Sequence, residues 1–468
     1  MPGFPPLNPS LVRLHLQAGG PLSAQSLAQS LKVNRVTVQR SLRQLGAQIV
    51  KLGVTRRTRY AQRRQVMGRG SDFRIYRLNL SGNQAHEWAT LTALYGGWRL
   101  EWAGTGVTPE WALRVHDHAG FCDGLPFFLT DLRPQGYLGR IAARQLPGGM
   151  GWPLDPRNWS DDQALSYLVQ YGNDLPGNLA IGDHTIGGAM LGLSSQAIPY
   201  TEREKRYPEM AAKADAGAPA GSSVEGEQPK FTAWVHEQNL QSHEAVIVKF
   251  TDQLDTPSGR RWADLLVAEQ IALNLLKPTS VADAEAPSTE IQDFGGRRFY
   301  QISRFDRVGS YGRRGMVSLR ALHDAGFAGQ DTNDWVVAAR GLYAGGWLSA
   351  ADVDIVRLRY LFGQLIGNTD MHFGNLACFL DNGLPLRLTP AYDMLPMLWA
   401  PRPGSAEPAP VFSPAPPLPG DQSVWSQAAS LAIEFWQRVA QTAQASDSFR
   451  RHAENALAAV RSLHDRFG

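Results

Sequence analysis

A short stretch in the last third of the chain combines a carboxylate, an imidazole and an amide between two apolar segments. Asp370, His372 and Asn375 lie within six residues of one another. A carboxylate can orient an attacking hydroxyl and accept its proton, and an amide oxygen nearby can hold a magnesium ion. These residue types predict phosphoryl transfer from a nucleoside triphosphate. Because one loop aspartate is more often only solvated, the interpretation depends on what accompanies it.

Two spacings support this interpretation. Asn375 follows Asp370 by five positions, as the magnesium-binding asparagine follows the base in the protein-kinase catalytic loop. Asp393 follows a short apolar segment and the turn signal at 381–383, so Asn375 and Asp393 could bind one metal from either side of a hairpin. Three roles are open for His372: structuring the loop, a simple hydrogen-bonded loop histidine, or a metal ligand, which would need ligands that no nearby segment supplies.

Further upstream, the elements that would position these residues carry two more charges. A buried-strand pattern at 244–250 contains one lysine, Lys249, which either reaches water from an edge strand or points at nucleotide phosphates. Glu269 lies twenty residues later on an expected helix at 262–276, close to the lysine–glutamate spacing of kinases. A strand pattern from 299 ends where a kinase places its adenine hinge.

The whole composition is that of a folded protein with several domains. At 468 residues and 43% apolar content, we expect two to four domains. The two cysteines, Cys122 and Cys378, are far apart and lack metal-ligand spacing, which predicts neither a disulfide framework nor a zinc site and fits the cytoplasm. We see no apolar run long enough for a membrane span and no signal peptide pattern.

Charge is distributed unevenly. Residues 1–70 contain 12 Lys or Arg and no Asp or Glu, whereas the remainder has 34 basic and 43 acidic residues. A basic segment of this kind is typical of a nucleic-acid-binding domain, although anionic membranes and acidic proteins attract such surfaces too.

That basic segment has the element order of a winged helix-turn-helix. Helical patterns begin at 11–16 and cover 23–31 and 35–45, and short strands at 49–52 and 59–61 flank a basic tip. The resemblance covers about 60 residues and implies that the third helix enters the DNA major groove; the alternative is a winged helix that docks proteins. The expected DNA-contacting residues are Arg35, Thr37, Gln39, Arg40 and Arg43 on the third helix and Arg56, Arg57 and Arg59 on the wing.

Other segments are less informative. Residues 72–200 predict a small α+β subdomain whose tryptophans lie in its core, and 201–221 predict a flexible excursion. The Pro-rich stretch 400–420 is either an irregular surface loop or a polyproline ligand. Apolar periodicity predicts helices at 426–443 and 446–467.

Taken in order, residues of about 160–440 resemble the HipA family of serine/threonine kinase toxins, and the whole chain resembles members with a fused N-terminal winged helix. The motifs that carry the resemblance are Ser223-Val-Glu-Gly-Glu-Gln-Pro-Lys230, Val248-Lys249-Phe250, Arg304-Phe-Asp-Arg307, Ile366-Gly-Asn-Thr-Asp370-Met-His372-Phe-Gly-Asn375 and Pro390-Ala-Tyr392-Asp393. The resemblance implies an α+β, two-lobed protein-kinase-like fold that binds ATP and Mg²⁺.

The resemblance also implies a role for individual residues. Asp370 takes the position of the catalytic base, and Asn375 and Asp393 take those of the metal ligands. Lys249 takes that of the phosphate-binding lysine, with Glu269 as its partner, and Ser303 to Phe305 take that of the adenine hinge. Ser223 falls on the serine whose autophosphorylation switches the family's kinases off. The residues expected to contact ATP are Glu225, Gly226, Glu227, Gln228, Lys230, Lys249, Ser303, Arg304, Phe305, His372, Asn375, Tyr392 and Asp393.

Two function hypotheses follow. The first is an ATP-dependent protein serine/threonine kinase of the HipA toxin type, coupled to duplex DNA by its own winged helix. The second is a DNA-binding transcriptional regulator with a kinase-like domain that transfers no phosphate. Glu225 and Glu227 favour the second, because they stand where the family has small residues and would repel a triphosphate.

The resemblance predicts partners and a domain order as well. Expected partners are duplex DNA, a protein substrate such as a translation factor or aminoacyl-tRNA synthetase, and a separate antitoxin, with no membrane. The predicted domains are 1–68, a winged helix-turn-helix; 72–200, a HipA N-terminal-type α+β subdomain; 201–305, a kinase N-lobe with the phosphate loop; and 306–468, a helical C-lobe with the catalytic loop.

Overall fold

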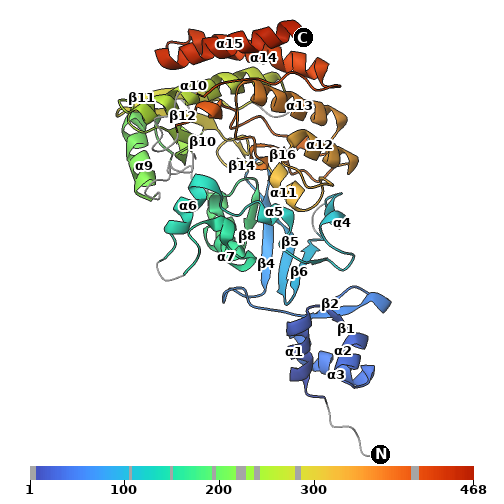
Figure 1. Cartoon of the computed structure of the whole chain (residues 1–468). Helices are drawn as coiled ribbons and strands as arrows, with labels where there is room; N and C mark the ends of the chain where they lie inside the picture. The colour runs from blue at the N-terminus through green and yellow to red at the C-terminus, as the bar shows by residue number, and fades with distance from the viewer. Residues whose placement is uncertain are drawn as a thin grey trace, which may run out of the picture. The chain divides into compact units, whose positions relative to one another are not determined.

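The computed structural model divides the chain into two compact units (Figure 1). The first unit consists of Met1–Asn79, Asn83–Arg133 and Asn158–Leu191, and the second of Leu80–Gly82, Pro134–Arg157 and Gly192–Gly468. The structure describes residues 7–104, 108–147, 151–191, 197–217, 228–236, 243–279, 286–401 and 410–468. Within these ranges, no helix has the length and hydropathy needed to cross a membrane.

The first unit begins with three short helices, α1 (Pro9–Gly19), α2 (Ala24–Ser30) and α3 (Arg35–Leu45). Each starts at a side-chain cap, because the Asn8, Ser23 and Asn34 side chains accept a backbone N–H from the first turn. The helices share an apolar core made of Val12, Leu16, Ala24, Leu27, Ala28, Val38 and Leu42.

A small antiparallel sheet of order β1-β3-β2 accompanies these helices, with β1 between α1 and α2. It contains β1 (Leu22–Ser23), β2 (Ile49–Leu52) and β3 (Arg59–Gln62), and the β2–β3 hairpin matches the expected strands. One side of the hairpin is buried with residues further along the unit: Val50, Leu52, Ala61, Leu94 and Phe121 form one cluster. The hairpin therefore shares a core with the α+β subdomain of the first unit.

That subdomain is built on a five-stranded antiparallel sheet of order β7-β6-β5-β4-β8. Trp98, Trp111 and Trp159 are buried in it, so these tryptophans are core residues as expected. The strands are β4 (Asp72–Leu78), β5 (Ala85–Leu94), β6 (Gly97–Trp102), β7 (Phe121–Cys122) and β8 (Leu179–Ile181), and the helices of the subdomain are α4 (Ala112–Val115), α5 (Phe127–Thr130), α7 (Asp161–Tyr171) and α8 (Asp183–Leu191).

The second unit contains a four-stranded antiparallel sheet of order β11-β12-β10-β9. Val246, Val248 and Phe250 on β10 pack into a cluster with residues of α6 and α9, whereas Lys249 between them faces α10. The sheet is thus covered on both faces. Its strands are β9 (Lys230–His236), β10 (His243–Phe250), β11 (Thr289–Phe294) and β12 (Arg297–Ser303), and its helices are α6 (Gly136–Arg144), α9 (Arg203–Gly217) and α10 (Pro257–Leu276).

The prediction of a flexible segment at 201–221 was wrong for its described part, which contains helix α9; residues 218–221 lie outside the described residues. Tyr207, Ala211 and Ala214 recur at helical spacing and are buried against the sheet. Because charged residues between them dominate the composition of the segment, this apolar face of the helix was not recognised in the sequence.

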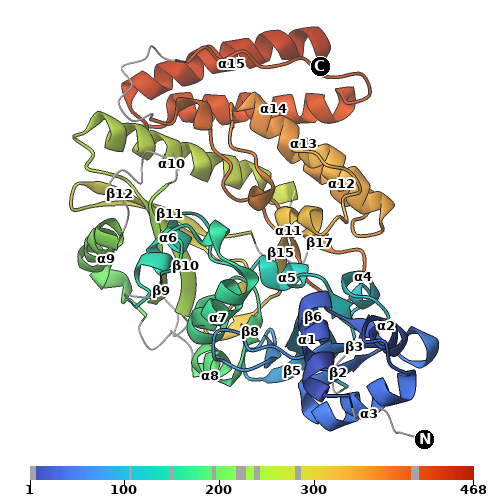
Figure 2. The same cartoon turned by 60° about the horizontal axis from the view of Figure 1, so that its bottom comes forward.

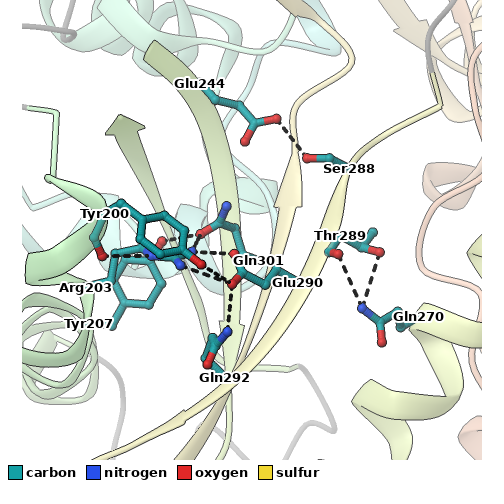
Figure 3. A network of polar contacts seen from close by, with 10 residues as sticks. All are labelled: Tyr200, Arg203, Tyr207, Glu244, Gln270, Ser288, Thr289, Glu290, Gln292 and Gln301. Carbon is teal, nitrogen blue, oxygen red and sulfur yellow. Dashed lines mark hydrogen bonds and ion pairs between the residues drawn. The ribbon is translucent and has the colours of Figure 1, made fainter. Parts of the chain in front are cut away.

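A buried polar network also holds α9 on the sheet (Figure 3). The Arg203 guanidinium, 3% exposed, donates to Glu290 at 2.6 Å and to Gln301 at 2.9 Å, and the Tyr207 hydroxyl donates to the same Gln301 oxygen at 2.5 Å. Arg203 is therefore a core residue of this helix–sheet contact.

The rest of the second unit is mainly helical. Helices α14 and α15, which were expected from their apolar periodicity, lie side by side in Figures 1 and 2, and α14 also packs on α10 and α13. The helices are α11 (Leu319–Asp324), α12 (Trp335–Ala344), α13 (Ala350–Leu365), α14 (Gln422–Gln441) and α15 (Asp447–Phe467), and the short strands are β13 (Arg307–Val308), β14 (Gly312–Arg313), β15 (Met316–Ser318), β16 (Ala377–Phe379) and β17 (Arg387–Leu388).

Candidate active site

The centre of the site is the Lys249 ammonium, which contacts two carboxylates. Its Nζ lies 2.6 and 2.7 Å from the two carboxylate oxygens of Glu269 on α10 and 2.5 Å from Oδ1 of Asp393, which follows β17. The side chains of Lys249 and Glu269 are 5% and 0% exposed, whereas that of Asp393 is 33% exposed. Because β10 is an interior strand, Lys249 is not the edge-strand lysine of the alternative interpretation.

The mutual contacts determine the charges of these groups. Burial opposes the charged form of Lys249, but Asp393 and Glu269 outweigh it and raise the pKa of the lysine. Burial likewise opposes ionisation of Asp393, but Lys249 and Lys230 outweigh it and hold the pKa of this carboxyl well below its usual range. Burial raises the pKa of Glu269. At neutral pH the site therefore presents an ammonium and an ionised, partly exposed carboxylate.

The loop between α13 and β16 holds the backbone of Asp370 from both sides. Asn368 Oδ1 accepts the Asp370 N–H at 3.0 Å, and Asn375 Nδ2 donates to the Asp370 carbonyl at 2.7 Å. The Asp370 side chain is exposed. Asn368 also donates to the carbonyl of Asp393 at 3.5 Å, so one asparagine links the loop to the second acid. Sequence reasoning missed Asn368, although asparagine is a known turn residue because its side chain can accept the backbone N–H two residues further on.

Asn375 and Asp393 are chemically suited to magnesium. The Asn375 side chain is buried, and because its nitrogen contacts the Asp370 carbonyl, its oxygen is directed to the other side of the amide. An amide oxygen and a carboxylate, together with phosphate oxygens, are the hard ligands that Mg²⁺ prefers. Among the described residues, no group of three or more His, Cys, Asp or Glu side chains is arranged to bind a metal.

His372 structures the loop. Its Nδ1 accepts the backbone N–H of Gly374 at 3.0 Å, and its carbonyl accepts the indole N–H of Trp335 at 3.2 Å. The same loop contacts Tyr392, whose hydroxyl donates to the Gly374 carbonyl at 2.8 Å. Tyr392 and His372 thus both fix the turn that precedes Asn375.

The expected adenine hinge ends strand β12. Ser303 and Arg304 use their backbone N–H groups inside the protein, on the carbonyls of Ser288 at 3.0 Å and Ala245 at 2.9 Å. Within the described part of the chain, the Phe305 N–H donates no hydrogen bond to a backbone carbonyl. Of the three expected hinge residues, Phe305 is therefore the one whose backbone can donate to a ligand.

Side chains of the hinge contact the rest of the site. The Phe305 ring lies 5.8 Å from that of Tyr392, next to Asp393. The Arg304 guanidinium binds both oxygens of Asp306 at 3.0 and 2.9 Å.

The expected phosphate loop is described only at its end. Ser223, Glu225, Gly226 and Glu227 lie outside the described residues. Gln228 donates to the carbonyl of Phe250. Lys230 pairs in register with Lys249, and its charge contributes to the low pKa of Asp393. Lys230 thus adds positive charge at the phosphate side of the site.

The expected DNA-binding residues differ in how available they are. Arg35, Arg40 and Arg43 on α3 are exposed, and Gln39 is half-buried. Thr37 is partly used at the helix start, where its hydroxyl donates to Asn34 at 2.8 Å.

On the wing, Arg57 is exposed, and the side chain of Arg56 lies outside the description. Arg59 is ion-paired with Asp117 and lies over the Phe121 ring at 5.1 Å. Arg59 therefore binds the α+β subdomain of the same unit.

Two known protein families match long parts of this chain. Residues 69–190 match the family described as the YjjJ-like toxin middle domain, and residues 222–466 match the HipA-like C-terminal domain. Toxin YjjJ of Escherichia coli strain K12 is 32% identical over 450 residues, which are 96% of each chain. The chain belongs to the YjjJ-like toxins of the HipA family. The recognition made from the motifs is thereby confirmed.

Solved structures support the fold of this HipA-family chain. HipA of Shewanella oneidensis MR-1, in a complex of HipA, HipB and its operator DNA, matches 84% of this chain and 97% of its own with a TM-score of 0.52 and 15% identity. The expected kinase-like fold is thus confirmed. The Helicobacter pylori kinase CtkA matches 51% of this chain and 90% of its own with 14% identity and a TM-score of 0.34.

Proposed function

We propose that this HipA-family toxin is an ATP-dependent protein serine/threonine kinase. The observation that carries the proposal is the buried Lys249 ammonium between Glu269 and Asp393. A strand lysine, a helix glutamate and a late aspartate in this contact are the phosphate-binding and metal-binding parts of a kinase. Burying an ammonium almost completely costs hydration free energy, so we would not expect a site without activity to retain it.

Each residue then has one task. Lys249 binds the α and β phosphates, and Asn375 and Asp393 hold Mg²⁺, which neutralises charge on the phosphate oxygens when it is bound. Asp370 accepts the proton of a serine or threonine hydroxyl, whose oxygen forms a bond to the γ phosphorus while the bond from that phosphorus to the β–γ bridging oxygen breaks. The Phe305 N–H donates to the adenine.

Autophosphorylation tests the proposal. After incubation with ATP and Mg²⁺, we expect intact mass and peptide mapping to find phosphate on Ser223 in the wild type and none in Asp370→Asn. Asp465→Asn is the control, since it makes the same change at an exposed position of α15. If the wild type neither gains phosphate nor binds ATP, the kinase proposal is wrong and the regulator without phosphate transfer takes its place.

For the N-terminal helices and hairpin we propose duplex DNA as the partner. The exposed Arg35, Arg40 and Arg43 on one helix and Arg57 on the adjoining hairpin support this, since DNA-binding surfaces collect Lys and Arg on one face. The HipA relative is solved with an operator DNA, which makes DNA a reasonable partner to test.

The salt dependence of DNA binding provides the test. Removing one arginine that binds a DNA phosphate should reduce the slope of log K against log salt by about 0.9, so Arg40→Ala should bind more weakly with a shallower slope. The exposed Lys213 on α9 is the matched control, and Lys213→Ala should leave both unchanged. The measurement requires the full chain, because the hairpin shares a core with Leu94 and Phe121. A fragment of residues 1–70 would expose the apolar side of the hairpin. Salt-independent binding, or none, would refute DNA recognition.

A further inference from the structure

The turn between α14 and α15 binds the helix that carries Glu269. The Ser446 N–H donates to Oδ1 of Asp264 and the Ser446 hydroxyl to Oδ2, both at 2.7 Å. Asp264 lies on α10 and is 2% exposed. A buried carboxylate with two donors from one distant residue is a strong and directional contact.

The same turn also binds the sheet. Arg298 on β12 donates to the carbonyl of Gln444 at 2.7 Å, and Asp293 holds the Arg298 guanidinium with two bonds of 2.8 Å. Ser446 in addition caps α15, since its hydroxyl oxygen accepts the Phe449 N–H at 3.3 Å. The turn is therefore attached to both the helix and the strand that border the Lys249 site.

Asp264 and Glu269 hold α10 from different sides. Five residues correspond to about 140° around a helix and about 7.5 Å along it. Glu269 contacts Lys249 on the sheet, whereas Asp264 contacts Ser446 on the helical hairpin. Because a helix moves as a rigid body, a rotation or shift of α10 that breaks one contact displaces the other.

We propose that Asp264 is a positioning residue: through Ser446 it fixes α10 so that Glu269 meets Lys249. The consequence for catalysis rests on the proposed kinase function, but the effect on the Lys249–Glu269 pair does not. Asp264 touches no reacting atom and acts only through the helix.

The reactivity of Lys249 tests the pair without any kinase assay. The full-length protein is treated with a water-soluble acetylating ester, and acetylation of Lys249 is followed by peptide mass spectrometry. The exposed Lys51 on β2 is the internal reference. In the wild type, Lys249 is buried and paired and should react slowly.

Two substitutions of Asp264 form a matched pair. Asp264→Ala removes both acceptors and should raise the Lys249 rate relative to Lys51 at least about tenfold, because bonds to a charged group are among the strongest in a protein. Asp264→Asn can still bond to the Ser446 N–H and hydroxyl and should leave the ratio near that of the wild type. If Asp264→Ala does not fold, Ser446→Asp replaces it: aspartate still caps α15 but repels Asp264, and should raise the ratio likewise.

Phosphoryl transfer gives the second readout. Asp264→Ala should lower the turnover rate strongly in the wild-type background and hardly at all in a protein that already carries Glu269→Gln, since Asp264 acts only through Glu269. The proposal would be overturned if the acetylation rate of Lys249 relative to Lys51 were unchanged in the folded Asp264→Ala or Ser446→Asp protein. It would also be overturned if Asp264→Ala lowered turnover as strongly in the Glu269→Gln protein as in the wild type. If the ratio rises but the wild type transfers no phosphate, the positioning role stands and the kinase proposal fails.

Discussion

Replacing Lys249 by methionine should destabilise the second unit strongly. The substitution leaves the carboxylate of Glu269, which is 0% exposed, without the ammonium that now lies 2.6 and 2.7 Å from its oxygens. Breaking a buried ion pair by removing one partner costs about 3–5 kcal/mol. Because burial already raises the pKa of Glu269, this carboxyl can take up a proton in the variant, so we expect the lower half of that range.

Removing both buried charges should restore most of the stability. Apolar side chains of similar volume often replace a buried ion pair at no cost. The double variant Lys249→Met/Glu269→Leu should therefore have a higher unfolding free energy than Lys249→Met, even though Asp393, 33% exposed, still lacks its ammonium. It should nevertheless have no kinase activity.

Urea unfolding at neutral pH compares the wild type, Lys249→Met, Glu269→Leu and the double variant. Lys213→Met on the exposed face of α9 is the control and is expected within about 0.5 kcal/mol of the wild type. The unfolding free energy of Lys249→Met should also depend on pH. Burial raises the pKa of Glu269, and the variant removes the ammonium that opposes this, so the protonated carboxyl should contribute stability at low pH that is lost as the pH rises through the folded pKa. If the two single losses simply add in the double variant, Lys249 and Glu269 are not paired in solution and the reasoning is refuted.

Three further predictions concern residues outside the centre of the site. Burial raises the pKa of Asp264, so this carboxyl contributes stability below its unfolded pKa of about 4 that is lost as the pH rises through its folded pKa. The unfolding free energy measured in urea should therefore decrease less between pH 4 and pH 7 in Asp264→Asn than in the wild type, and an equal decrease in both proteins would contradict this. Arg203→Met leaves Glu290 without its buried cation and should lower the unfolding free energy by about 2 kcal/mol, which calorimetry can check; an unchanged melting temperature would show that the network is not formed. Burial raises the pKa of Cys122 to about 12 and that of Cys378 further, so Ellman's reagent should label neither thiol in the native protein and both in urea, and prompt native labelling would contradict the buried placement.

Local patterns allowed much of the fold to be predicted from the sequence. Helix α3 has its expected bounds because Asn34 caps its start and Gly46 its end, and both signals lie within the segment itself. Strand β10 was recognisable as an apolar run interrupted by Lys249, and α14 and α15 by their apolar spacing.

Contacts between distant residues could not be predicted in this way. Lys249 and Asp393 are 144 positions apart, and Ser446 and Asp264 are 182 apart, so no window of sequence contains either pair. The role of Asn368 depends on where the chain after β17 passes, and Arg59 looked available for DNA because its partner Asp117 belongs to another segment. Such pairs are determined by tertiary packing, which local periodicity does not record.

Transfer of the γ phosphate of ATP, measured in the same samples as ATP affinity, tests most directly whether the Lys249 site is a working kinase. We predict that the wild type transfers phosphate in a magnesium-dependent reaction, and that Asp370→Asn binds ATP as tightly as the wild type but transfers none. Undiminished transfer by Asp370→Asn, or ATP binding that is unaffected by Lys249→Met, would contradict this prediction.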